Sequence, residues 1–440
     1  MRSSLLAVAG CLLLPSVASR AASDDQTSTR PNKYKNWRQQ TPPKMVVFAD
    51  SNSDTGRRFN APASFQFEDI GAWPWKRLYD GPDSHEKTAA YMPMEGTPTN
   101  GKMWPTWLRI PDEHNFAVSS ATATDTYRSR EICTGYTGEG EEFPYGTLQE
   151  QIDRYMFEIV DNTHETLDYT HVIFIGTNEL NRVVQAITRY SLGAALVGPA
   201  YSDPVAFDRV FEVDAVTGFP VLGDDGLPVP TFAPMVEEVI GAWADGIDRL
   251  LKAGVTGRIL LGNVGSPKGL PDIFGTPNAV ILDQVAQALR FGAQGIAAMY
   301  PQVRMLDLYT LFAGLVDAPS MFEDLGFTPG ENSLLGDSCV QFNFFVDDTA
   351  DIMGTQHLRH PDCQEQCALC ADAASPCQNC FHGNPAITKC DDPSSKIFYD
   401  RLHFTTDFQL VFGEAVRQCS KDAPKYDRPL VRVMCPPEEA

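Results

Sequence analysis

The stretch KMVVFADSNSDTGRRFN, residues 44–60, decides how the rest of the chain is interpreted. Four apolar residues, Met45 to Phe48, run directly into the small polar sequence Ala-Asp-Ser-Asn-Ser-Asp-Thr-Gly. A continuous apolar run of this kind is typical of a strand that is buried on both faces. The polar residues after it predict either a plain turn or a loop that presents a reactive side chain at the end of a sheet. Ser51 is the first hydroxyl after the run.

The rest of the chain alternates between strand-like and helix-like patterns. Short β-rich runs are expected to form strands at 45–49, 115–118, 171–175, 258–263 and 303–308. Apolar residues at helical spacing predict helices at 235–251, 279–299 and 405–418. Strands that alternate with helices favour an α/β fold with a parallel sheet covered on both faces. Ligands of such sheets bind beyond the carboxyl ends of the strands, and Ser51 lies just past the first strand.

Composition and charge indicate a globular protein that does not bind nucleic acid. The chain has 440 residues, of which 43% are hydrophobic and 21% charged, so it can bury a large core. Its formal net charge of −22 repels phosphate backbones and anionic membranes, so we expect no nucleic-acid partner.

The first residues resemble a leader for export. One Arg precedes an apolar run from Leu5 to Leu14, and small residues follow near 19–22. This pattern predicts a signal peptide at 1–22 and a secreted protein. The run is shorter than the ~20 apolar residues that span a bilayer, and no later run is long enough, so we expect no transmembrane segment. We expect a polar linker at 23–43, a single domain at 44–420 and a C-terminal tail at 421–440.

The cysteines favour disulfides. Of the 11 cysteines, Cys11 lies in the predicted leader, which leaves an even number. Residues 357–392 contain two Cys-x-x-Cys pairs separated by six residues, whereas zinc sites usually separate their pairs by ~12–20. We therefore expect a disulfide-rich insertion, either bracing the candidate site or lying away from it, with a zinc-dependent hydrolase as the weaker alternative. Further bridges are expected among Cys133, Cys339, Cys419 and Cys435.

Several polar residues have the chemistry of a serine hydrolase. A serine hydroxyl becomes nucleophilic when a base removes its proton, and that base is normally a histidine oriented by a carboxylate. Asp400 and His403 are three residues apart in KIFYDRLHFTTDFQ, so one turn places both side chains on the same side. Donors for a developing oxyanion are offered by Asn178, in HVIFIGTNEL, and by the backbone N–H groups of Ser119 and Ser120, in NFAVSSATATD.

These segments resemble the four sequence blocks of the SGNH (GDSL-type) hydrolases, and they occur in the family's order. FADSNSDTG at 48–56 is similar to Gly-Asp-Ser-Leu-Ser-Asp-Thr-Gly, and NFAVSSATA at 115–123 is similar to Asn-Phe-Ala-Val-Gly-Gly-Ala-Thr-Ala. GTNE at 176–179 resembles Gly-x-Asn-Asp, and FYDRLHFTT at 398–406 resembles the last block. TNGKMWPTWL at 99–108 is similar to a Ser/Thr-Asn-Gly-x-x-Trp segment of many members. The resemblance covers about 44–418.

The resemblance implies a fold, an activity and a set of site residues. The fold is a flavodoxin-like three-layer α/β/α sandwich with a mostly parallel sheet. The activity is hydrolysis of carboxylic esters through an acyl-enzyme, with a small-molecule, lipid or glycan ester as substrate and no metal or organic cofactor. The implied site residues are Ser51 as nucleophile, His403 as base, Asp400 as its orienter, Ser120, Asn178 and the N–H of Ser51 as oxyanion donors, and Asn100 and Trp104 as substrate-binding residues.

Three departures from the family pattern keep a second hypothesis open. Ala49 replaces the first-block glycine, Ser120 replaces a second-block glycine, and Glu179 replaces the Asp after Asn178. Ala at position 49 is costly only if its φ is positive. The alternative is therefore a catalytically weak or inactive binding or effector protein on the same scaffold.

Overall fold

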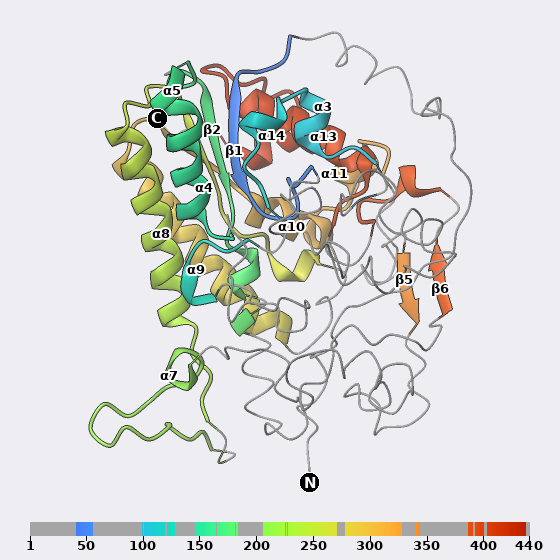
Figure 1. Ribbon diagram of the computed structural model, residues 1–440. Coiled ribbons are helices and arrows are strands. Elements are labelled where there is room, and N and C mark those ends of the chain that lie inside the picture. The colour runs from blue at the N-terminus through green and yellow to red at the C-terminus, as the bar shows by residue number, and fades with distance from the viewer. Residues whose placement is uncertain are drawn as a thin grey trace, which may run out of the picture.

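Four parallel strands form the centre of the fold, and helices cover both faces of the sheet (Figure 1). The structure is a computed structural model. It describes residues 41–55, 99, 101–118, 121–127, 146–163, 165–180, 182–183, 206–224, 226, 228–270, 278–327, 340–343, 386–389, 392–399 and 403–436. The α/β class and the parallel sheet expected from the sequence are confirmed.

The strands of the central sheet are β1 (Met45–Ala49), β2 (Thr170–Phe174), β3 (Ile259–Gly262) and β4 (Val303–Leu306), and they pair in that order. A separate antiparallel pair consists of β5 (Val340–Asn343) and β6 (Ala386–Lys389). The longer helices are α4 (Leu148–Tyr155), α8 (Ala233–Lys252), α9 (Asn278–Met299), α10 (Leu308–Asp317) and α13 (Thr406–Cys419). The shorter helices are α3 (Trp104–Leu108), α5 (Asp161–Thr163), α7 (Phe207–Val210), α11 (Ser320–Glu323) and α14 (Pro429–Met434), and a π-helical stretch, Met156–Val160, joins α4 to α5.

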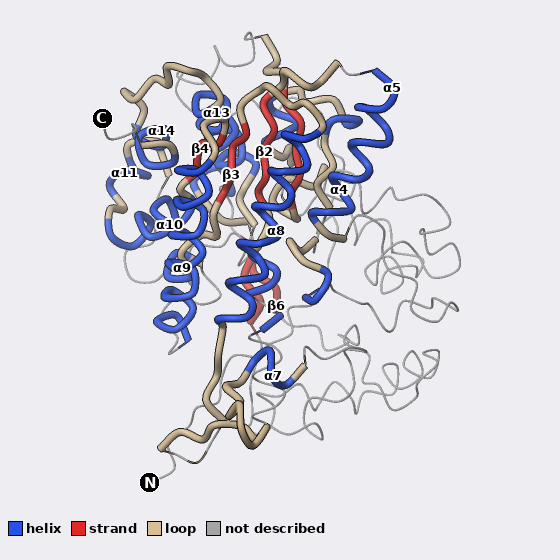
Figure 2. Tube along the Cα trace, turned by 90° about the vertical axis from the view of Figure 1, so that its left-hand side faces the viewer, coloured by secondary structure: helices blue, strands red, loops and turns tan. Residues whose placement is uncertain are grey.

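Strand β1 shows why its apolar run forms the centre of the sheet. All five residues are buried. Because successive side chains point to opposite faces, Val46 and Phe48 pack into the cluster under α4, α8 and α9, and Val47 packs into the cluster under α10, α13 and α14. Figure 1 shows these two groups of helices on opposite sides of the strands, and Figure 2 shows β2, β3 and β4 side by side with α8 crossing in front.

The predicted strand 115–118 is held against the outer side of β1 without forming a regular strand. Asn115 makes an isolated parallel bridge with Val47. The N–H of Phe116 donates to the Val47 oxygen at 2.7 Å, and the N–H of Val118 donates to the Ala49 oxygen at 3.0 Å. The extended segment thus runs parallel to β1 and ends at the same edge of the sheet.

Residues 421–436, expected as a tail, pack against the body of the domain. A disulfide joins Cys419 at the end of α13 to Cys435 just after α14. The N–H of Asp307, which follows β4, donates to the Met434 oxygen at 2.6 Å. The other cysteines expected to form bridges lie outside the described residues. Among the helices that the structure describes, none is long and apolar enough to cross a membrane.

A buried histidine lies at the start of β2. His171 is fully buried, its Nδ1 donates to the Tyr169 oxygen at 3.0 Å, and its Nε2 accepts from the Tyr155 hydroxyl at 2.9 Å. Tyr155 in turn bonds the Thr166 hydroxyl at 2.8 Å. Burial lowers the pKa of His171 to about 4, so the imidazole is neutral at ordinary pH.

This histidine should make the fold sensitive to acid. Between pH 6.5 and about 4 the unfolded chain binds a proton at His171 that the folded chain does not, so stability rises with pH across that window and is complete above it. We expect the free energy of unfolding of the native protein to fall by ~1.4 kcal/mol per pH unit on acidification, relative to a His171→Phe variant. Urea unfolding of both proteins from pH 7 to pH 4 measures this difference, and parallel curves would contradict it.

Candidate active site

Ser51 lies in the loop that follows β1, residues 50–55, which we call the β1 loop. The N–H of Asp50 still bonds the Phe174 oxygen of β2 at 3.3 Å, so the loop leaves the sheet at Asp50. The N–H of Ser53 then donates to the Asp50 oxygen at 3.1 Å and turns the chain. Ser51 lies in this turn and is partly exposed, whereas Ser53 is fully buried.

Buried polar side chains from three other segments hold the β1 loop and Ala49, the residue just before it. Gln151 of α4 pairs with the backbone of Ala49, with its Oε1 accepting from the N–H at 2.9 Å and its Nε2 donating to the oxygen at 3.0 Å. Asn115 Nδ2 donates to the Ser53 oxygen at 2.9 Å. Trp104 Nε1 donates to the Ser53 hydroxyl at 2.9 Å. Because these three side chains and Ser53 are fully or almost fully buried, the bonds are shielded from competing water.

His403 lies in a hairpin-like segment just before α13. Phe398 and Phe404 form an antiparallel bridge, and the N–H of Tyr399 donates to the His403 oxygen at 2.7 Å. Thr405 caps α13 by accepting from the N–H of Phe408 at 3.3 Å. Phe404 is 1% exposed, so the residue after His403 is anchored in the core.

Ser51 and His403 meet across the site. His403 Nε2 lies 3.0 Å from Ser51 Oγ, although the two residues are 352 positions apart in the sequence. For Nε2 to accept the serine proton, the ring must carry its hydrogen on Nδ1. The predicted orienter, Asp400, lies outside the described residues.

Asp50, next to Ser51, is a buried acid. It is 1% exposed and its Oδ1 accepts from the N–H of Asn52 at 3.1 Å. Burial raises the pKa of Asp50 to about 6, against the opposing effects of the Asn52 N–H and the nearby His403. The carboxylate of Asp54 adds to the increase. A negative charge on Asp50 is therefore costly, and a positive charge on His403 makes it less so.

Asn178 follows the adjacent strand, β2, and a glycine sets its direction. Gly176 has a φ of 141°, a backbone conformation that favours glycine. A Cβ at Gly176 would also lie only 3.1 Å from Trp243 Cζ2, whose ring closes over this turn by donating to the Ile175 oxygen. Two residues later, Asn178 Nδ2 donates to the Ala121 oxygen at 2.8 Å. The predicted Asn178 is therefore fixed against the loop that follows Val118.

Glu179 is a second buried acid at this edge. It is fully buried, and its Oε1 accepts from the N–H of Ala123 and from the N–H of Thr124, the latter at 3.1 Å. Its Oε2 and the Tyr127 hydroxyl are both buried without a hydrogen-bond partner among the residues that the structure describes. Burial, with a smaller contribution from the charge of Asp50, raises the pKa of Glu179 to about 8 despite these backbone donors.

The remaining sequence predictions have mixed outcomes. Ser119, Ser120, Asn100 and the Cys-rich segment 357–385 lie outside the described residues. Trp104 is fully buried and bonds the β1 loop, and its role in substrate binding stays a prediction. Ala49 is the last residue of β1, and its φ is not positive, so alanine is not strained there. In the described part of the chain, Arg109 is the one non-glycine residue with a positive φ.

The sequence interpretation did not identify Gln151 or Gln409. Gln409 of α13 is fully buried, its Oε1 accepts from the N–H of Trp104 at 3.2 Å, and its Nε2 donates to the Asn52 oxygen at 3.5 Å. A single glutamine on a helix has no pattern that marks it as buried.

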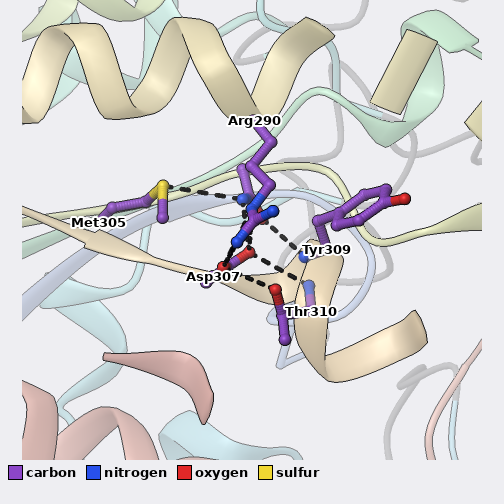
Figure 3. A network of polar contacts seen from close by, with 6 residues as sticks. Arg290, Met305, Asp307, Tyr309 and Thr310 are labelled. Carbon is purple, nitrogen blue, oxygen red and sulfur yellow. Dashed lines mark hydrogen bonds and ion pairs between the residues drawn. The ribbon is translucent and has the colours of Figure 1, made fainter. Parts of the chain in front are cut away.

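A second polar network lies at the ends of β3 and β4 (Figure 3). Asp307 accepts from Arg290, with Nη2 at 2.6 Å, and from Asn263 Nδ2 at 3.0 Å and the Thr310 hydroxyl at 2.7 Å. Its carboxylate is buried and saturated with donors, which is the arrangement of a structural brace. Among the described residues, no group of three or more His, Cys, Asp or Glu side chains is arranged to hold a metal ion.

The protonated Glu179 should make native stability fall as pH rises, which is the opposite of the pH dependence expected from His171. Between pH 4.5 and about 8 the folded chain keeps a proton on Glu179 that the unfolded chain releases, so native stability falls as pH rises. Relative to Glu179→Gln, we expect the native protein to lose ~1.4 kcal/mol per pH unit across that range. Urea unfolding of both proteins at pH 5 and pH 7.5 tests this, and a constant difference would show that Glu179 does not hold the proton.

Comparison of the chain with models of protein families and with curated proteins finds no match.

Proposed function

We propose that this protein is a serine hydrolase of carboxylic esters. The observation that carries the proposal is the 3.0 Å separation of Ser51 Oγ and His403 Nε2. A hydroxyl and an imidazole at this distance have the geometry for proton transfer that activates a serine. The resemblance of the surrounding segments to the SGNH hydrolases supports the same assignment.

The proposed reaction proceeds through an acyl-enzyme. Ser51 Oγ attacks the ester carbonyl carbon while His403 Nε2 takes the hydroxyl proton, and the imidazolium then protonates the leaving alcohol. Water attacks the acyl-enzyme with His403 as base, which releases the acid and restores Ser51. The buried Asp50 favours the imidazolium electrostatically. Asp400 remains the proposed orienter of His403.

The oxyanion would be held near the ends of β1, β2 and the extended segment 115–118. Asn178 Nδ2 has two hydrogens, and its bond to the Ala121 oxygen fixes the amide while using one of them. The other hydrogen is available to a substrate oxygen. The backbone N–H groups of Ser51 and Ser120 complete the proposed hole.

The strand order supports the finer description of the fold. When the extended segment 115–118 is counted beside β1, the sheet follows the order 2-1-3-4-5 in chain sequence. This order is flavodoxin-like, and its topological switch point lies between the two strands that carry Ser51 and Asn178. Ligands of open α/β sheets bind at such a point.

The proposed substrates are acyl lipids, phospholipid acyl chains or acetylated carbohydrates. The proposed location is outside the cell. The Cys419–Cys435 disulfide supports that location because structural disulfides persist mainly in oxidising compartments.

Ser51→Ala and His403→Gln should each abolish turnover. Both changes remove one partner of the proton transfer, so we expect kcat for short p-nitrophenyl esters to fall by at least about 10³-fold. Fluorophosphonate should label the native protein at Ser51, as located by peptide mass spectrometry, and should not label Ser51→Ala. A graded series of acyl esters and acetylated glycans then defines the substrate class.

Two matched variants control for non-specific damage. Ser320→Ala removes an exposed hydroxyl at the start of α11, and His114→Gln removes a partly buried imidazole that contacts Tyr169. Both should keep native activity. If Ser51→Ala hydrolyses esters as fast as the native protein, the proposed function is wrong and a binding role on this scaffold becomes the better explanation.

A further inference from the structure

Two consecutive residues at the end of β2 hold the same turn of the chain, residues 121–124. Glu179 accepts from the N–H groups of Ala123 and Thr124. Asn178 donates to the Ala121 oxygen at 2.8 Å. Three backbone groups of one turn are thus bonded to adjacent side chains, and these bonds join the second sequence block to the third.

The turn is also fixed from its other side. Val118 bonds the Ala49 oxygen at 3.0 Å, directly before the β1 loop. Positions 119 and 120, which lie outside the described residues, connect Val118 to the 121–124 turn. The backbone on both sides of Ser120 is therefore tied to the ends of β1 and β2, the strands that carry Ser51 and Asn178.

The arrangement around Glu179 requires an acceptor rather than a charge. Among the residues that the structure describes, Glu179 makes no salt bridge, and its Oε2 has no hydrogen-bond partner. One oxygen, Oε1, accepts both backbone N–H groups. A buried carboxylate held only in this way is costly, and its raised pKa, about 8, agrees with a neutral acid at pH 7. An amide oxygen in the same place would accept the same two donors.

We propose that Glu179 is a positioning residue of the oxyanion hole, whose Oε1 holds the 121–124 turn in place and thereby fixes the Ala121 oxygen that orients the side-chain amide of Asn178. The inference rests on the proposed esterase function. Glu179 acts through the 121–124 turn and does not touch the substrate. Its loss should therefore weaken binding of the transition state more than binding of the substrate.

The test compares three variants with the native protein. Glu179→Gln keeps an acceptor oxygen, Glu179→Leu has a similar size without an acceptor, and Glu179→Asp withdraws the oxygen by one methylene. For a short p-nitrophenyl ester we expect Glu179→Leu to lower kcat about 100-fold with KM within about threefold, as for loss of an oxyanion donor. Glu179→Gln should keep kcat within about threefold, and Glu179→Asp should fall about tenfold.

Two further measurements separate positioning from general damage. Thermal unfolding shows whether each variant is folded, and Glu179→Asp replaces Glu179→Leu as the deciding variant if the latter does not fold. Hydrogen exchange should show loss of protection at the Ala123 and Thr124 amides in Glu179→Leu and retention in Glu179→Gln.

The outcomes distinguish the inference from the function on which it rests. Ester turnover that is equal in the native protein and Ser51→Ala would overturn the proposed function. Turnover that depends on Ser51, with native kcat in folded Glu179→Leu or Glu179→Asp, would overturn the positioning role alone. An equal loss of kcat in Glu179→Gln and Glu179→Leu would also overturn it, because the acceptor would then not be the group that matters.

Discussion

The contact between Ser51 and His403 depends on the packing of α13 against the segment that contains α3. His403 lies directly before α13, and Ser51 lies in the β1 loop, so the distance between their side chains depends on how the helix meets the sheet. Three hydrogen bonds fix this arrangement. Thr99 Oγ1 donates to the Phe404 oxygen at 2.7 Å, Gln409 accepts from the N–H of Trp104, and Trp104 Nε1 donates to Ser53. Trp104 therefore joins the loop of the proposed nucleophile to the helix that follows the proposed base.

The same edge of the sheet shows two ways of burying a carboxylate. At the ends of β3 and β4, Asp307 is saturated by donors that include a guanidinium, and such a pair contributes rigidity rather than reactivity. At the ends of β1 and β2, Asp50 and Glu179 are equally buried but have only backbone donors in the hydrogen bonds described above. Burial raises the pKa values of both Asp50 and Glu179, and these backbone donors offset only part of the increase. Buried acids with raised pKa values next to Ser51 and His403 are consistent with the proposed active site at this edge.

The sequence predicted those features that have a local pattern. Apolar runs predicted all four strands of the central sheet, and apolar residues at helical spacing predicted α8, α9 and α13. Both patterns arise because a buried strand or helix places apolar residues at regular positions in the sequence. Ser51 and Asn178 were selected as polar residues at strand ends, and His403 was selected by its spacing from Asp400 and by the family resemblance. Gln151 and Gln409 could not be predicted, because their role depends on which backbone groups they meet across the fold. A tryptophan in a Pro- and Gly-rich stretch is more often part of a core than of a ligand surface, and the burial of Trp104 agrees with that general expectation.

The positive φ of Gly176 affects the proposed site because it determines where Asn178 and Glu179 lie. A side chain at Gly176 would meet Trp243 and Val264 and would also be forced into a conformation that favours glycine, so the turn after β2 in its present form depends on glycine at this position. That turn brings Asn178 and Glu179 against the 121–124 turn, where one donates and the other accepts. A shift of this backbone would move both contacts together and would displace Asn178, the proposed oxyanion donor, relative to Ser51. Gly176 therefore contributes to the proposed site through backbone geometry alone, although it has no functional group.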